Sequence, residues 1–149
     1  MCGIRTRSSR VASDGTGEAK VTGTSQNDTV RLELPASAKQ VRLARLVAGG
    51  MASLLGFDLD AVEDLRIAVD ELCSHLLETG DGSPLVLEFS VVDSAVEVTG
   101  RTPLKPDAAV DEERQELSAQ ILAVTCETYW VRLDQPEAAF WLRSRSQNG

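Results

Sequence analysis

The chain contains 149 residues, of which 42% are hydrophobic, and carries a formal net charge of -8. This length favours a single domain that buries its own hydrophobic core. No apolar run approaches the ~20 residues needed to cross a bilayer, and residues 1–10 lack the apolar core of a secretory signal. We therefore expect a cytoplasmic protein without a membrane partner.

The negative charge lies in the body of the chain. Residues 1–27 contain four Arg or Lys and two Asp or Glu, a net charge of +2, which leaves -10 for residues 28–149. An acidic body repels phosphates, which argues against a nucleic-acid partner and favours a basic protein partner; it also fits a role in solubility alone. Residues 1–27 are rich in Ser, Thr and Gly and are predicted to be a disordered tail before a single domain at residues 28–149.

The three cysteines, Cys2, Cys73 and Cys126, are widely spaced and form no metal-ligand pattern. Cys73 and Cys126 fall on apolar helical stretches, where a cysteine is typically a small core residue. We expect neither a disulfide framework nor a metal site.

The first predicted elements are a short alternating strand at Thr29–Leu34 and a helix over about Ala36–Leu55, opened by Pro35. The apolar stripe of this helix consists of Val41, Ala44, Val47, Met51 and Leu54. Its neighbouring glycines, Gly49 and Gly50, cost roughly 1 kcal/mol each and mark either close packing of another backbone or a weak point.

A second helix is predicted from about Asp60 to Glu78. Asp60 and Glu63 have the spacing of a capping box, and the stretch Gly80–Pro84 is a strong stop. The predicted buried face consists of Leu65, Ala68, Val69, Leu72, Cys73 and Leu76.

The second half of the chain is predicted to form two hairpins around a third helix. Strands at Leu85–Val92 and Ala95–Thr99 lead into a loop at Gly100–Val110 and a helix at about Asp111–Thr125. Leu117, Ile121 and Val124 have helical spacing, and strands at Thr128–Leu133 and Ala138–Arg143 close the domain. Helices grouped against a largely antiparallel sheet predict an α+β two-layer sandwich.

Glu71 and His75 lie four residues apart on the second helix and therefore share one face of it. Such a pair fits a general base with a polar partner. It also fits a surface contact worth roughly a few tenths of a kcal/mol, which is the more common case, and the spacing leaves both interpretations open.

Three stretches resemble a known family: "LELPASAKQVRLARLVAGG" leading into the first helix, "DAVEDLRIAVDELCSHLLE" in the second, and the hairpin "LVLEFSVVDSAVEV". They are similar to the GHKL superfamily of ATPases and, within it, to the bacterial anti-sigma factor/serine-protein kinases of stress and sporulation control. The resemblance covers residues 29–143. It implies a Bergerat fold, a homodimer, sequestration of a sigma factor, and Mg-ATP-dependent phosphorylation of a serine on an anti-anti-sigma partner.

The family's ATP-site positions are degenerate here. Its catalytic glutamate matches Glu71, but its Mg²⁺-binding asparagine falls on His75, and Mg²⁺ prefers oxygen ligands. Its Asp-x-Gly-x-Gly box falls on Gly100, Thr102 and Leu104, where Gly100 has no carboxylate to read adenine. Its glycine-rich phosphate loop falls on a glycine-free stretch, residues 112–118, whose three acidic side chains would repel a triphosphate.

These departures predict a pseudo-ATPase, with no cofactor expected and at most weak binding of Mg-ATP. For the partner-binding face, the resemblance places a contact arginine of the first helix at Arg45, with Arg42 as a nearby competitor; an ordinary solvated arginine is the alternative. Trp130 and Trp141 are predicted to pack on the sheet.

The resulting hypothesis is a bacterial anti-sigma factor that sequesters an alternative sigma factor by binding and is released by an anti-anti-sigma factor. One alternative is an active serine-protein kinase that uses Glu71 as its base. A second is a phosphotransfer or adaptor module that uses His75.

Overall fold

The computed structural model describes residues 29–146, so the predicted tail at residues 1–27 lies outside the described part. Within that part the chain forms five strands and three helices. Their bounds, in chain order, are β2 Val30–Leu34, α1 Ala38–Leu54, α2 Leu59–Thr79, β3 Leu85–Val92, β4 Ala95–Pro103, α3 Glu112–Thr125, β5 Thr128–Asp134 and β6 Glu137–Arg145.

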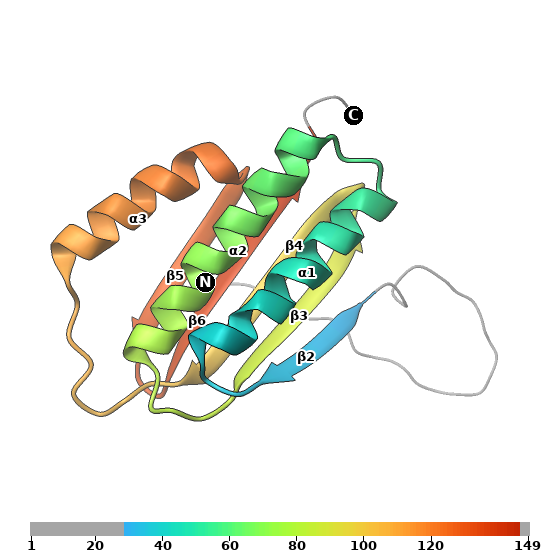
Figure 1. The fold of residues 1–149 in the computed structure, drawn as a ribbon. Helices are drawn as coiled ribbons and strands as arrows, with labels where there is room; N and C mark the ends of the chain where they lie inside the picture. The colour runs from blue at the N-terminus through green and yellow to red at the C-terminus, as the bar shows by residue number, and fades with distance from the viewer. Residues whose placement is uncertain (1–28, 147–149) are drawn as a thin grey trace, which may run out of the picture.

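The strands form one sheet in the order β2-β3-β4-β6-β5, and each neighbouring pair is antiparallel. Figure 1 shows α1 and α2 side by side on one face of this sheet, with α3 beyond α2, over the edge formed by β5 and β6. The predicted α+β two-layer sandwich is confirmed. No helix in residues 29–146 combines the length and hydrophobicity needed to cross a membrane.

Helix α2 is the centre of the helical layer, between α1 and α3 and above the sheet (Figure 1). All six residues predicted for its buried face are fully buried, because that face lies on the apolar side of the sheet. The helix begins earlier than predicted. Its N-cap is Asp58, not Asp60, and the Asp58 carboxylate accepts a hydrogen bond from the Ala61 N–H at 2.8 Å.

Helix α1 begins at Ala38, two residues later than predicted. Ser37 has extended backbone and its hydroxyl accepts a hydrogen bond from the Lys39 N–H at 3.3 Å, which is the geometry of an N-cap. Of the two glycines, Gly49 is in close packing: a Cβ there would lie 3.2 Å from Cδ of Arg66 on α2. Gly50 faces open space.

Strand β4 runs to Pro103, so the prediction that it ends at Thr99 and leads into a loop at Gly100 is wrong. Gly100 pairs with Leu87 of β3 and Phe140 of β6. Pairing on both sides outweighs the weak strand preference of glycine. Pro103 lies beyond the last pair of β3 and β4, so its missing N–H breaks no hydrogen bond between those two strands.

Helix α3 turns two of its large apolar residues outward. Leu117 and Val124, whose spacing predicted the helix, are 55% and 76% exposed. The buried residues of α3 are instead Ser118, Leu122 and Thr125. The helix is therefore held by one narrow face, most of it polar.

The two described cysteines differ in environment. Cys73 lies in the core, and burial raises the pKa of its thiol to about 12. Cys126 is not on a helix, because α3 ends at Thr125; it caps that helix and is half-buried, and burial raises the pKa of its thiol to about 11. Both thiols are therefore protonated and unreactive at neutral pH.

Candidate functional site

Glu71 lies on the side of α2 that faces α3, where Arg114 of α3 binds it. The Arg114 guanidinium forms a hydrogen-bonded ion pair with the Glu71 carboxylate and reaches Glu78, about two turns further along α2, at 3.2 Å. The side chains of Glu71 and Arg114 are only 14% and 26% exposed. The pair is therefore partly desolvated, which strengthens it relative to an exposed ion pair.

His75 is adjacent to this pair and is 5% exposed. Its Nε2 lies 2.7 Å from Oγ of Ser118 on α3. A hydrogen bond from Ser118 also helps to lower the pKa of Glu71. The contact between His75 and Ser118 thus joins α2 to α3 beside the ion pair.

The pKa values of Glu71 and His75 are both lowered, which makes each side chain a weaker base. Burial raises the pKa of Glu71, but the hydrogen bonds from Arg114 and Ser118 and the charges of Arg114 and His75 together hold it below its ordinary value. Burial and the charge of Arg114 lower the pKa of His75 and outweigh the charges of Glu71 and Glu78. Glu71 is therefore an ionised, weakly basic carboxylate, and His75 is neutral at pH 7.

A small cavity of about 270 Å³ opens beside His75. It is lined by His75, Glu78, Thr79, Ala109, Val110, Asp111, Arg114, Gln115 and Leu133. Its volume is below the ~300–1,000 Å³ of a typical ligand site. Neither Gly100 nor Thr102, the other predicted ATP-site positions, lines it.

Gly100 and Thr102 are both packed within the fold. A Cβ on Gly100 would collide with Phe140 and lie 2.7 Å from Cδ2 of Leu87. Thr102 is 2% exposed, and its hydroxyl donates to the carbonyl oxygens of Ser83 and Pro84 at 3.2 and 3.3 Å. These positions serve the sheet and the turn after α2.

The first turn of α3 is capped by the side chain of Asp111. The Asp111 side chain accepts a hydrogen bond from the Arg114 N–H at 3.1 Å, and Glu112 and Glu113 occupy the first turn. Such side chains complement the helix dipole and take the place an anion would occupy. Residues 29–146 contain no group of three His, Cys, Asp or Glu side chains placed to hold a metal ion. The predicted ATP-site positions His75, Gly100 and Thr102 are all engaged in contacts within the fold.

The predicted partner-binding arginines lie on α1, on the other side of α2 from the Glu71–Arg114 pair. Arg42 is exposed. Nε of Arg45 lies 3.7 Å from the Asp70 carboxylate and has no hydrogen-bond partner. The exposed residues Leu43 and Leu46 lie beside them on α1.

Trp130 and Trp141 face each other across β5 and β6, and both are half-buried. The Trp141 indole donates to Glu97 at 3.3 Å, and the Arg132 guanidinium lies 5.5 Å from the ring of Trp130. Both tryptophans thus take part in cross-strand packing.

The sequence analysis predicted no role for three residues of this site, Arg114, Ser118 and Glu78. A signal was present: Arg114 and Ser118 have the same four-residue spacing as Glu71 and His75. Each pair therefore lies on one face of its helix, and the two faces are chemically complementary.

No protein-family model matches the chain. The chain is 36% identical over 76 residues to the serine-protein kinase RsbW of Listeria monocytogenes serotype 4a (strain HCC23), a match that covers 48% of each protein. It is 31% identical over 75 residues to the serine-protein kinase RsbW of Halalkalibacterium halodurans, over 49% of this chain and 46% of that protein. The chain thus spans about half the length of the curated relatives it matches.

Among solved structures, the crystal structure of the SiaB-SiaC complex from Pseudomonas aeruginosa contains a chain of similar fold. The TM-score is 0.55 with 11% sequence identity, over 80% of this chain and 91% of that chain. At this identity the likeness shows the fold alone. The predicted resemblance is therefore confirmed over about half of the chain, as a similarity to the serine-protein kinases RsbW. The α+β fold is shared with the solved structure over 80% of this chain.

Proposed function

We propose that this protein is an anti-sigma factor that acts by binding and whose ATP chemistry is weakened or lost. It sequesters an alternative sigma factor, and an anti-anti-sigma factor releases it. The observation that carries the loss of chemistry is the ion pair between Glu71 and Arg114. The proposed partners are those that the family resemblance implies. That resemblance is supported by the similarity to the serine-protein kinases RsbW.

Three contacts support the loss of ATP chemistry. A general base must be free to take a proton, whereas Glu71 is held by Arg114 and Ser118. Nε2 of His75 is engaged by Ser118. Gly100 is packed under Phe140, where a carboxylate that reads adenine does not fit.

The proposed binding surface is the exposed side of α1, with Arg42, Leu43, Arg45 and Leu46. An arginine beside apolar side chains is typical of interface hot spots, and Arg45 is held only at 3.7 Å by Asp70, so it is free to bind a partner's carboxylate. The acidic body would cover a basic, DNA-facing or polymerase-facing surface of the sigma factor. An anti-anti-sigma factor would compete for the region around Arg45. A homodimer acting in the stress response is part of this proposal.

A pull-down of the host's sigma factors by the full chain tests the binding function. We expect one alternative sigma factor to be retained, and Arg45→Ala to weaken its binding by about tenfold or more. Arg101→Ala is the matched control, because Arg101 is exposed on β4, in the sheet layer. Retention of no sigma factor by the full chain contradicts the proposed function.

Calorimetry with Mg-ATP tests the chemistry separately. We expect no binding at micromolar concentrations. Micromolar affinity together with phosphate transfer that is lost in Glu71→Ala would instead support the kinase alternative. Acid-labile phosphate on His75 would support the phosphotransfer alternative, which the 5% exposure of this side chain argues against.

A further inference from the structure

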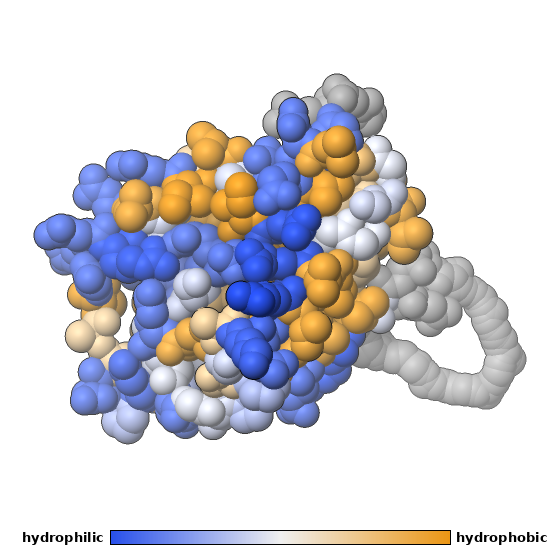
Figure 2. Space-filling model, in the orientation of Figure 1, coloured by the Kyte–Doolittle hydropathy of each residue, from blue (hydrophilic) through white to orange (hydrophobic). Residues whose placement is uncertain are grey.

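The outer face of α3 carries an apolar stripe that no other described element covers. Leu117, Ile121 and Val124 lie on successive turns of one helix face, and Leu117 and Val124 are 55% and 76% exposed. Single exposed apolar residues are ordinary, but a continuous stripe marks an interaction surface. Figure 2 shows hydrophobic side chains gathered over α3 and over α1, with hydrophilic side chains between them.

The N-terminal end of this stripe is acidic. Asp111, Glu112, Glu113 and Glu116 are all exposed. Arg114 is the only basic residue between Glu112 and Thr125, and its charge is already committed to Glu71 and Glu78. The field around this end is therefore negative.

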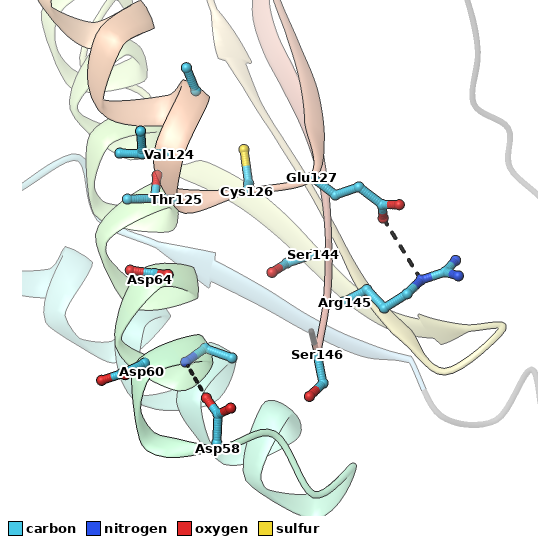
Figure 3. Close-up of a pocket in the computed structure, with 12 residues that line it drawn as sticks. Asp58, Asp60, Asp64, Val124, Thr125, Cys126, Glu127, Ser144, Arg145 and Ser146 are labelled. Atoms are coloured by element: carbon cyan, nitrogen blue, oxygen red, sulfur yellow. Dashed lines mark hydrogen bonds and ion pairs between the residues drawn. The ribbon is translucent and has the colours of Figure 1, made fainter. Parts of the chain in front are cut away.

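The C-terminal end of the stripe leads into an acidic cavity of about 530 Å³ between the start of α2, the end of α3 and the end of β6 (Figure 3). Val124 belongs to both the stripe and the cavity wall. Its acidic wall residues are Asp58, Asp60, Asp64 and Glu127, and its one basic residue, Arg145, lies 3.9 Å from Glu127. Figure 3 shows the hydroxyl of the buried Ser144 pointing from β6 toward α2, into this cavity.

We propose that the α3 stripe and the acidic cavity form a docking surface for a basic amphipathic helix of a partner protein. The apolar face of that helix packs on Leu117, Ile121 and Val124, and a Lys or Arg side chain near its end enters the cavity. Negative charge at both ends of the stripe selects an occupant with positive charge at both ends. From Glu113 to Val124 the surface spans about 16 Å, which matches about three turns of a helix.

The same charges disfavour the other occupants. A second copy that docked through the same surface would bring its own acidic ends of the stripe against these. A membrane with anionic lipids is repelled for the same reason. The surface lies across α2 from the α1 residues of the proposed function and does not depend on the partner being a sigma factor.

A designed peptide is a direct probe. We would titrate the isotope-labelled full chain with a helical peptide of about 16 residues that has a leucine stripe flanked by lysines, at about 0.15 M salt, and follow amide chemical shifts. We expect saturable binding of one peptide, with shifts centred on Leu117, Ile121, Val124 and Asp64. A peptide of the same composition in scrambled order, and one with glutamates for lysines, should bind at least about tenfold more weakly.

Matched variants decide where the peptide binds. Leu117→Glu with Val124→Glu should weaken binding by about tenfold or more without unfolding the protein, because both side chains are exposed. Leu46→Glu, on α1 and 63% exposed, should leave it unchanged. Asp60→Asn with Asp64→Asn should weaken it. The equal loss of charge in Asp93→Asn with Asp134→Asn, in the turn after β3 and at the end of β5, should not.

Several results would overturn the docking surface. Equal binding of the scrambled peptide, or an equal effect of Leu46→Glu, would mean non-specific hydrophobic attraction. A dimer in sedimentation velocity that Leu117→Glu dissociates would make a second copy the occupant. None of these results affects the pull-down of sigma factors through α1, so the two proposals fail independently.

Discussion

Arg114 of α3 donates a hydrogen bond to the carboxylate of Glu71 on α2, across 43 residues of sequence. The contact joins the glutamate that the family resemblance marks as catalytic to α3, whose first half is the degenerate phosphate-loop stretch at residues 112–118. The positive charge of Arg114 offsets the negative charge of Glu71 and holds α3 against α2, and the Arg114 side chain lines the cavity beside His75. One ion pair thus links the stability of the α2–α3 contact to the proposed loss of ATP chemistry.

Replacement of Arg114 should destabilise the protein. Arg114→Ala leaves Glu71, 14% exposed, as a poorly solvated carboxylate without its partner. We expect the free energy of unfolding in urea to fall by about 1–3 kcal/mol. Arg31→Ala is the matched control: Arg31 pairs with Glu88 at 2.8 Å, but both side chains are about half exposed, and its loss should cost about 0–1 kcal/mol. Equal effects of the two variants would contradict a special role for the Arg114 pair.

Stability should depend on pH through His75, the chain's one histidine. Its pKa in the folded protein lies below its ordinary value of 6.5, because of burial and the charge of Arg114, so the unfolded chain binds the proton first. The free energy of unfolding should therefore fall as pH drops below 6.5, by at most about 1.4 kcal/mol per pH unit. His75→Gln, which keeps a donor for Ser118, should lose less stability than the parent between pH 7.5 and 5.5.

The lowered pKa of Glu71 acts in a different range. Its contribution is present above the ordinary value of 4.5 and is lost as pH falls through the lower folded value, so it lies below the range of pH 7.5 to 5.5 used for His75. An identical slope in the parent and His75→Gln between pH 7.5 and 5.5 would show that His75 does not carry the effect.

Two glycine substitutions should have opposite signs. Gly100→Ala places a methyl group against Phe140 and 2.7 Å from Cδ2 of Leu87, and we expect a loss of about 1–3 kcal/mol. Gly50→Ala on α1 meets no atom within 4 Å and should gain about 0.5–1 kcal/mol from helix propensity. Urea denaturation of both variants measures the difference, and a neutral Gly100→Ala would contradict the packing role.

Restoring two family residues should not restore tight ATP binding. His75→Asn with Gly100→Asp supplies the asparagine and the aspartate, but Arg114 still binds Glu71, and the introduced carboxylate has no space beside Phe140. Calorimetry with Mg-ATP should detect no micromolar binding. Strong recovery by this double variant would show that the acidic start of α3 and the Arg114 pair matter less than we infer.

The sequence predicted the elements better than their ends or orientations. The 3.6-residue period of α2 identified six of its nine buried residues, because those six pack in the hydrophobic core; Ala61, His75 and Thr79 were not among them. The predicted end of β4 was wrong. Gly100 and Pro103 locally indicate the end of a strand, whereas Phe140, which is distant in sequence, pairs with Gly100 and extends the strand. The outward stripe of α3 was not predictable from periodicity, since α3 has apolar residues on both of its faces.

By itself, the sequence determined the α+β class, the buried side of α2 and the juxtaposition of Glu71 and His75, because each depends on spacing within one element. Only the tertiary structure decided which contacts Glu71 and His75 make and in which direction their pKa values shift. Their partners, Arg114 and Ser118, come from a helix 43 residues away, and only the packing of α3 on α2 brings the two four-residue spacings into contact. Desolvation and the charge of Arg114 then lower the pKa of His75, whereas hydrogen bonds and charges at the same contact outweigh desolvation and lower the pKa of Glu71. No local pattern encodes these effects.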